Sequence, residues 1–163
     1  MLKRASVALV VIDFQETLME KIPVAQGVVG ETVRLIRFAK LLDLPVLWTE
    51  QYPKGLGVTI PEIAAELDGL TPIEKTAFGC MADSHFVAAL QETGRTNLLI
   101  TGVETHVCVM QTALGAVERG FEVWVASDAV AAREKHQHKA GLERIEDSLC
   151  QLVTAEMAMF EIL

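Results

Sequence analysis

A chain of 163 residues is long enough for one domain with a substantial core, and a composition of 51% hydrophobic and 22% charged residues excludes an intrinsically disordered protein. The formal net charge of -8 argues against nucleic acid and anionic membranes as partners, because both are bound mainly through clustered lysine and arginine. We expect a single domain over residues 1–163, whose high apolar content also suits a subunit interface.

Three cysteines, Cys80, Cys108 and Cys150, are an odd number and form no C-x-x-C pair. A chain of this length does not need disulfides, so we expect reduced thiols and a cytoplasmic location. Residues 7–12 (VALVVI) have the hydrophobicity of a signal peptide core, but no small-residue cleavage site follows and the run is too short to span a bilayer. We interpret this run as the first strand.

Buried strands and amphipathic helices are predicted to alternate along the chain, from apolar runs, helical spacing, and proline and glycine at the boundaries. The predicted strands are residues 7–12, 45–49, 73–78, 98–103, 121–126 and 151–154. The predicted helices are residues 28–43, 61–67, 83–92, 105–119 and 134–149; residues 50–57 form a loop, and the tail 156–163 has no assigned form. This alternation predicts an α/β fold, a three-layer α/β/α sandwich around a doubly wound, mostly parallel sheet of about six strands.

Polar residues with complementary chemistry follow three of these strands. Asp13, Lys75 and Cys108 each fall near the carboxyl end of a strand, and such ends share one edge of a parallel sheet. Cys108 also lies where a helix is predicted to begin, so we expect its thiol to ionise readily, with Lys75 favouring the thiolate and Asp13 accepting the proton. Convergence alone is equally compatible with catalysis and with an ordinary polar sheet edge.

Four segments carry a family resemblance: residues 11–15 (VIDFQ), 48–53 (WTEQYP), 74–78 (EKTAF) and 102–109 (GVETHVCV). In this order they resemble the isochorismatase-like cysteine hydrolases, in particular the compact isochorismatase-domain-containing subgroup, over nearly the whole chain. The resemblance implies a catalytic triad of Asp13, Lys75 and Cys108. It also implies a cis peptide at Val103–Glu104 and an oxyanion hole formed by the backbone N–H groups of Glu104 and Cys108.

The activity that the resemblance implies is hydrolysis of a small amide-like C–N substrate through a thioester on Cys108, by a homo-oligomer. Nicotinamidase-type members place a metal in the loop after the second strand, but residues 50–54 (EQYPK) contain no histidine. We therefore expect neither a metal nor another cofactor, and not nicotinamide as the substrate. A cysteine at position 108 also points away from the vinyl-ether cleavage that gives the family its name.

Several residues keep two interpretations. Phe14, Trp48, Tyr52 and Phe78 are candidates for a substrate pocket or for the core, and Gln15 for supporting the site or capping the next segment. Asp128 is equally suited to supporting the site and to capping a helix. We expect His106, Cys80 and Cys150 to be structural, and His136 and His138 to lie on a solvated helix start.

Two other functions stay open: a catalytically idle relative that acts as a binding or scaffold subunit, and a redox protein that uses Cys108 alone. The absence of a resolving cysteine nearby in the sequence weakens the redox function.

Overall fold

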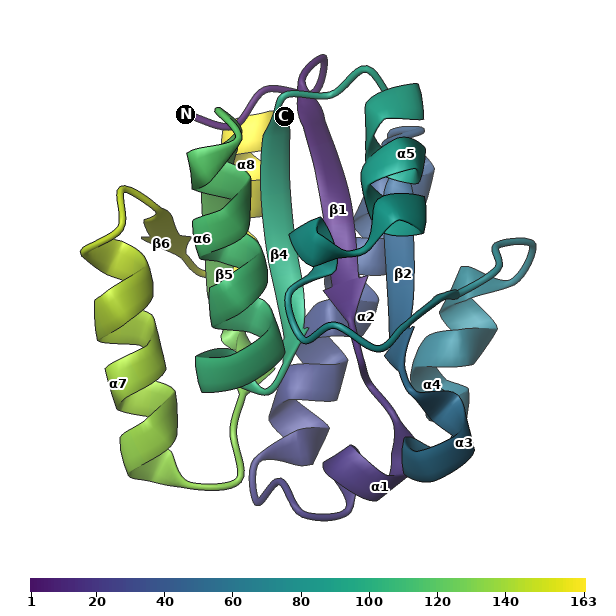
Figure 1. Cartoon of the computed structure of the whole chain (residues 1–163). Helices are drawn as coiled ribbons and strands as arrows, with labels where there is room; N and C mark the ends of the chain where they lie inside the picture. Colours follow the sequence, from purple (N-terminus) through teal and green to yellow (C-terminus); the bar gives the residue numbers. More distant parts are fainter.

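The computed structural model describes residues 1–163, and its centre is one six-stranded sheet (Figure 1). The strands are β1 (Val7–Ile12), β2 (Val46–Gln51), β3 (Ile73–Lys75), β4 (Asn97–Val103), β5 (Glu122–Ala131) and β6 (Gln151–Val153). Their order across the sheet is β3-β2-β1-β4-β5-β6, and every neighbouring pair is parallel. The strand order reverses between β1 and β4, which is where doubly wound sheets open a ligand crevice at the carboxyl edge.

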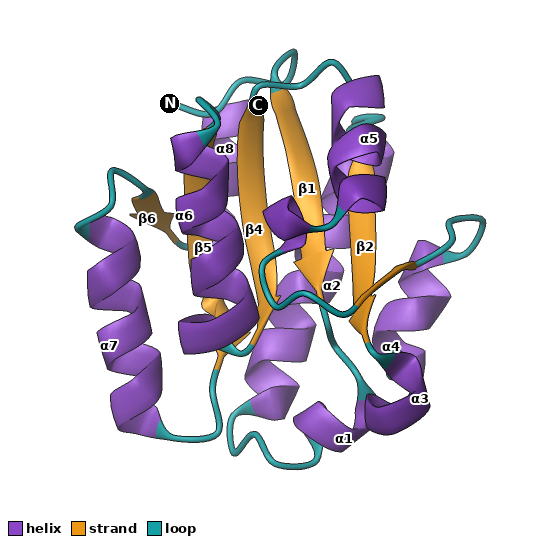
Figure 2. Ribbon diagram, viewed as in Figure 1, coloured by secondary structure: helices purple, strands orange, loops and turns teal.

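Helices cover both faces of this sheet. The helices are α1 (Glu16–Met19), α2 (Ala25–Leu41), α3 (Pro53–Leu56), α4 (Pro61–Ala64), α5 (Ser84–Glu92), α6 (Met110–Glu118), α7 (Lys135–Glu146) and α8 (Ala155–Ile162). Short 3₁₀ turns lie at η1 (Ala65–Leu67) and η2 (Cys80–Ala82), and a π-helical turn at η3 (Thr105–Val109). In Figure 2, α5, α6 and α7 lie in front of the strands, and α2 and α8 lie behind them.

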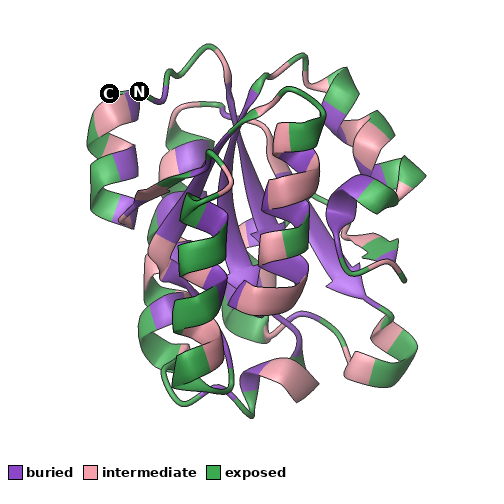
Figure 3. Cartoon of the chain, turned by 60° about the vertical axis from the view of Figure 1, so that its left-hand side comes forward, coloured by how far each residue is buried: buried purple, intermediate pink, exposed green.

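The core consists of two apolar clusters, one on each face of the sheet. The larger holds 25 buried residues and includes side chains of α2 and α8, and the smaller holds 19 and includes side chains of α5, α6 and α7. All residues of β1 and β4 are buried, as expected for central strands of a parallel sheet (Figure 3). The predicted three-layer α/β/α sandwich with a doubly wound sheet is therefore confirmed.

Some predicted boundaries were wrong. β2 continues to Gln51, where a loop was expected from residue 50, because Glu50 and Gln51 pair with Glu74 and Lys75 of β3. β3 itself ends at Lys75 instead of residue 78. β5 runs to Ala131, five residues beyond its predicted end, because its last two residues pair again with β4 after a shift in register.

The helices also differ in detail from the prediction. The helix expected over 105–119 starts as the π turn η3, in which the N–H of Val109 donates to the carbonyl of Glu104, and continues as α6. The tail without an assigned form is α8, and the four-residue helices α1 and α3 were not predicted. No helix is both long and apolar enough to cross a membrane.

Candidate active site

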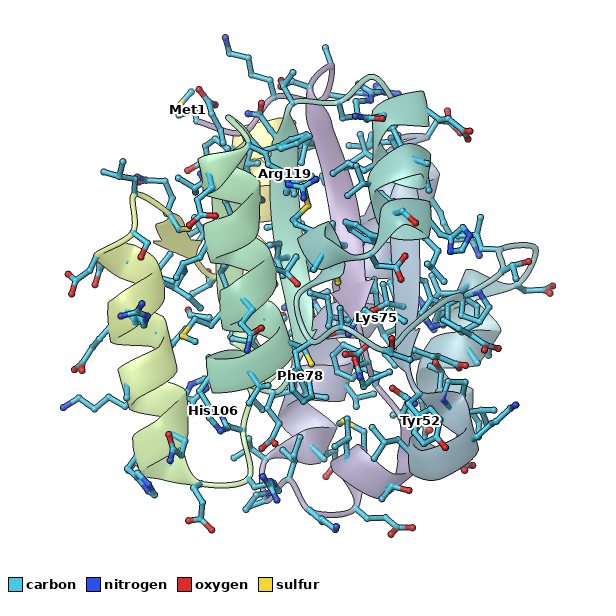
Figure 4. All side chains as sticks on the ribbon, in the orientation of Figure 1. Met1, Tyr52, Lys75, Phe78, His106 and Arg119 are labelled. Carbon is cyan, nitrogen blue, oxygen red and sulfur yellow. The ribbon has the colours of Figure 1, made fainter.

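Asp13, Lys75 and Cys108 meet at the carboxyl edge of the sheet, and we call these three residues the edge cluster. Lys75 ends the edge strand β3, yet its side chain reaches past the end of β2 to Asp13, which follows β1; Nζ lies 2.7 Å from Oδ2. Both side chains are fully buried. Figure 4 shows Lys75 and Phe78 near the carboxyl ends of the central strands. The long lysine side chain is what allows residues from non-adjacent strands to form an ion pair.

The ammonium of Lys75 has four hydrogen-bond acceptors. Besides Asp13, it donates to Oε1 of Gln51 at 2.8 Å and to the carbonyls of Phe78 at 3.0 Å and Ala77 at 3.3 Å. Burial is the largest single influence on the pKa of Lys75 and acts to lower it, but the charge of Asp13, the two nearby thiols and the hydrogen bond to Asp13 together raise it. Lys75 is therefore a fixed positive charge at neutral pH.

Asp13 is held by its backbone and by a second donor. Its φ of 55° lies in the left-handed region, which a non-glycine residue adopts rarely. The hydroxyl of Thr49 donates to Oδ1 at 2.8 Å, so each carboxylate oxygen of Asp13 accepts a hydrogen bond, one from Thr49 and one from Lys75. A buried carboxylate needs such partners to remain charged.

Cys108 lies in η3 and is 5% exposed. Burial raises the pKa of its thiol, the negative charge of Asp13 raises it further, and Lys75 lowers it by less. The expectation that the helix start and Lys75 would make this thiol ionise is wrong. The reason is that burial and the adjacent carboxylate disfavour a second negative charge, so the proton stays on sulfur at neutral pH.

Cys80 is a second thiol beside the edge cluster, which the sequence did not indicate. Its backbone N–H donates to Oγ1 of Thr112 at 2.9 Å, and the same hydroxyl donates to the carbonyl of Cys108 at 2.7 Å. Burial raises the pKa of Cys80 to about 11, while Lys75 acts to lower it. The prediction that Cys80 is a buried structural residue agrees with its full burial.

The loop that precedes Cys108 is fixed by two side-chain contacts. Its Val103–Glu104 peptide bond is cis, and the N–H of Glu104 donates no hydrogen bond within the chain. The Glu104 carboxylate accepts the backbone N–H of Arg133 at 2.8 Å and Nε of Arg133 at 3.1 Å. Oγ1 of Thr105 lies 2.8 Å from Nδ1 of His138. Both contacts join the loop to the segment from the end of β5 into α7.

The candidate pocket residues separate into core and surface. Phe14 is fully buried in the larger apolar cluster, and Trp48 packs in the same cluster with Nε1 donating to Thr59. These two side chains are therefore core residues and not part of a solvent-facing pocket. Tyr52 and Phe78 are each 54% exposed near the edge cluster, and Figure 4 shows Tyr52 beside α3.

Gln15 binds the end of β2 and the loop after it and makes no side-chain cap to α1. Its amide nitrogen donates to the carbonyls of Gln51 at 2.9 Å and Gly57 at 2.8 Å, and its amide oxygen accepts the N–H of Gln51 at 2.7 Å. Gln51 in turn binds Lys75. This chain of contacts fixes the residue that orients the ammonium.

The remaining polar candidates, Asp128 and the histidines, mostly have structural roles. Asp128 accepts the backbone N–H of Ala155 at 2.8 Å, which caps the start of α8. Nδ1 of His106 is buried without a hydrogen-bond partner. His138 is partly buried and bound to Thr105, so the expectation that it lies on a solvated helix start was wrong, whereas His136 is exposed.

Comparison with known proteins gives a consistent family assignment. The Isochorismatase domain model matches residues 7–157. Isochorismatase domain-containing protein 2A of Mus musculus is 37% identical over 155 residues, which cover 92% of this chain and 71% of the mouse protein.

Solved structures give the same result. The MAR1 ribonuclease of Caenorhabditis elegans superposes with a TM-score of 0.92 at 34% identity, over 99% of this chain and 83% of that one. The YcaC gene product of Escherichia coli, an octameric hydrolase of unknown specificity, gives a TM-score of 0.90 at 27% identity, over 99% and 81%.

The parallel sheet, its switch point and these similarities define a protein with an isochorismatase-like hydrolase fold. The chain belongs to the isochorismatase family, which confirms the resemblance noted in its sequence.

Proposed function

We propose that the protein is a metal-independent cysteine hydrolase that cleaves a small amide-like C–N bond. The observation that carries this proposal is the buried Asp13–Lys75 ion pair beside the Cys108 thiol at the switch point of the sheet. A buried ion pair contributes little net stability after its desolvation cost, and perturbed ionisable groups gather at functional sites, so this pair favours a functional site. The three residues supply a base, a fixed positive charge and a nucleophile.

In the proposed first step, sulfur of Cys108 attacks the substrate carbonyl carbon as its proton passes to the Asp13 carboxylate. Negative charge then moves from the carboxylate to sulfur and on to the carbonyl oxygen. The proton stays within the edge cluster, so the total charge of the cluster is unchanged. Lys75 lies beside both residues and stabilises the negative charge on either one. The N–H groups of Glu104 and Cys108 are the proposed donors to the oxyanion, and the N–H of Glu104 has no other acceptor in the chain.

Collapse of the tetrahedral intermediate breaks the C–N bond, and Asp13 returns the proton to the leaving amine. This leaves a thioester on Cys108. Asp13, again a carboxylate, accepts a proton from the attacking water, and the thiolate leaves from the second tetrahedral intermediate and regains that proton. The products are a carboxylic acid and an amine or ammonia, and Cys108 returns as a thiol.

Ammonia release from a panel of small primary amides tests this proposal. Wild-type protein should release ammonia, Cys108→Ala should not, and Cys150→Ala should match wild type because Cys150 takes no part in the edge cluster. Release by Cys108→Ala at the wild-type rate would refute the mechanism.

A catalytically idle relative remains the second candidate, because Cys108 is only 5% exposed and its thiol is protonated at rest. Iodoacetamide labelling separates the two. A nucleophile should be alkylated faster than Cys80 and Cys150 in the native protein, whereas an idle thiol should not.

The proposed substrate is a small molecule and not nucleic acid. The C. elegans relative is described as a ribonuclease, but a net charge of -8 opposes approach of a polyanion to this chain. We also propose a cytoplasmic location, because the mechanism needs Cys108 reduced.

A homo-oligomer is part of the same proposal. The E. coli relative is octameric, and α8 and its end expose apolar side chains at Met157 (50%), Phe160 (71%) and Leu163 (79%). A solution mass equal to one chain, measured by light scattering, would contradict an oligomer.

A further inference from the structure

A hollow of about 410 Å³ opens at the carboxyl edge of the sheet between the end of β5, the start of α7 and the turn before α2. Pro23 and Val24 line one side of it, and Arg133, Lys135 and His138 line another. This volume lies within the range of small-molecule sites in proteins. None of the edge-cluster residues lines this hollow.

The charge of the hollow is opposite to that of the chain. Its lining includes arginine, lysine and histidine and no acidic residue, although the chain carries a net charge of -8. Lys135 forms no ion pair, whereas Lys139, one turn further along α7, lies 3.7 Å from Glu143. Lys135 is thus a cation without a carboxylate partner, and Arg133, although paired with Glu104, lies beside it in the same lining. Positive charge of this kind in an acidic protein favours an anionic ligand.

Arg133 is oriented with donors to spare. Its Nε lies 3.1 Å from both carboxylate oxygens of Glu104, and its backbone N–H also binds that carboxylate. Nη1 and Nη2 make no hydrogen bond within the chain, and the side chain is 52% exposed. A guanidinium anchored through Nε keeps a planar pair of donors suited to bidentate binding of a carboxylate.

His138 adds a fixed ring beside Arg133. Nδ1 lies 2.8 Å from Oγ1 of the buried Thr105, which holds the imidazole, while Nε2 has no partner in the chain. Burial lowers the pKa of His138, so the ring is neutral at physiological pH and contributes hydrogen bonding rather than charge.

The hollow adjoins the edge cluster through Glu104. The last residue of β4, Val103, pairs with Ala131 at the end of β5, next to the hollow. Glu104 follows Val103: its N–H is the proposed oxyanion donor, and its carboxylate holds Arg133. Glu104 therefore links the loop before Cys108 to Arg133 of the hollow, which it binds.

We propose that this hollow binds the carboxylate end of the molecule whose C–N bond Cys108 attacks, so that the substrates are small amides carrying a carboxylate. The inference rests on the proposed hydrolase function. A carboxylate suits the hollow better than a phosphate, because no glycine lines it to form the backbone N–H cradle typical of phosphate sites.

Direct binding to the Cys108→Ala protein tests the inference without turnover. The probes are succinamate and glutaramate, each with one amide and one carboxylate, and the neutral diamides succinamide and glutaramide. Calorimetry should show at least one of the two carboxylate probes binding about tenfold or more tightly than its diamide. In the Cys108→Ala background, Lys135→Gln should weaken that binding about threefold or more, and Arg133→Gln should weaken it further. The matched control Lys139→Gln in the same background should leave the binding unchanged.

Equal affinity for carboxylate and diamide probes, or no effect of Lys135→Gln and Arg133→Gln, would overturn the inference. Lys135→Gln is the deciding variant because the exposed Lys135 side chain makes no hydrogen bond or ion pair whose loss could disturb the fold. Ammonia release by wild type separates this inference from the proposed function. Hydrolysis of diamides without carboxylate preference would retain the hydrolase and reject the hollow, whereas Arg133-dependent binding without hydrolysis would retain the hollow and reject the hydrolase.

Discussion

Replacing Lys75 by methionine should destabilise the fold more than any change of a surface charge. The ammonium is fully buried, and its removal leaves the Asp13 carboxylate with only the Thr49 hydroxyl as a partner. Breaking a buried ion pair from one side costs about 3–5 kcal/mol, a large part of the 5–15 kcal/mol that typically stabilises a domain. The carbonyls of Ala77 and Phe78 lose their donor as well, so we expect the upper part of that range.

The double variant Asp13→Asn/Lys75→Met isolates the cause. It removes the unpaired charge, so at least half of the stability lost in Lys75→Met should return, because charge burial and not lost packing dominates the cost. Urea unfolding followed by fluorescence of the buried Trp48 and Trp124 measures each variant, with Lys139→Met as the exposed control expected within about 0.5 kcal/mol of wild type. A loss below about 1 kcal/mol for Lys75→Met, or a double variant no more stable than the single one, would refute the reasoning.

Three further predictions concern the same region. Asp13→Asn should abolish ammonia release, because the carboxylate that accepts the thiol proton in the proposed first step is gone; release at the wild-type rate would contradict this. The free energy of unfolding measured in urea should fall as pH rises from about 9 to 11. The buried thiols have raised pKa values, so the folded chain keeps their protons to higher pH than the unfolded chain does. A constant free energy of unfolding over that range would contradict the raised values. Gln15→Leu should cost about 2–4 kcal/mol of stability, since it leaves the buried backbone N–H and carbonyl of Gln51 unsatisfied. The control Glu16→Gln, at the exposed neighbouring residue, should change the free energy of unfolding little in the same urea assay. Equal effects of the two variants would argue against the contacts between Gln15 and Gln51.

The convergence of Asp13, Lys75 and Cys108 could be predicted because it depends on one topological rule. Strands of a parallel sheet end at a common edge, so residues after β1, β3 and β4 meet there whatever the loops do. The length of the lysine side chain then joins non-neighbouring strands. Convergence needs only strand identity, which the apolar runs of β1 and β4 indicate clearly, whereas β3 has only one apolar residue, Ile73.

The protonation state of Cys108 could not be predicted in the same way. A local argument from the helix start counts the dipole and the nearby lysine, but the pKa depends on how deeply tertiary packing buries the sulfur and on how close Asp13 comes. The contacts of Glu104 with Arg133 and of Thr105 with His138 were missed for a related reason. Each pair is separated by about thirty residues and carries no local pattern.

The short elements show the same limit at the level of secondary structure. α1 and α3 have four residues each, so hydrophobic periodicity has too few positions to detect them. α8 is capped by Thr154, whose hydroxyl accepts the N–H of Met157, and by Asp128, which accepts the N–H of Ala155. Asp128 was expected as a possible helix cap, but it lies 27 residues before Ala155, so no local pattern connects it to residues 156–163.

A protonated thiol at rest changes what the edge cluster has to do. With Asp13 negative, Lys75 positive and Cys108 neutral, the buried set carries no net charge, which is the least costly state in a low-dielectric site. Moving the proton from sulfur to Asp13 leaves the net charge at zero, with Lys75 now paired with the thiolate. For Cys108 to act as proposed, activation is therefore an internal proton transfer and not an ionisation to solvent. The pH dependence of the reaction would then report the cluster as a coupled unit, and no single pKa in it would belong to the cysteine alone.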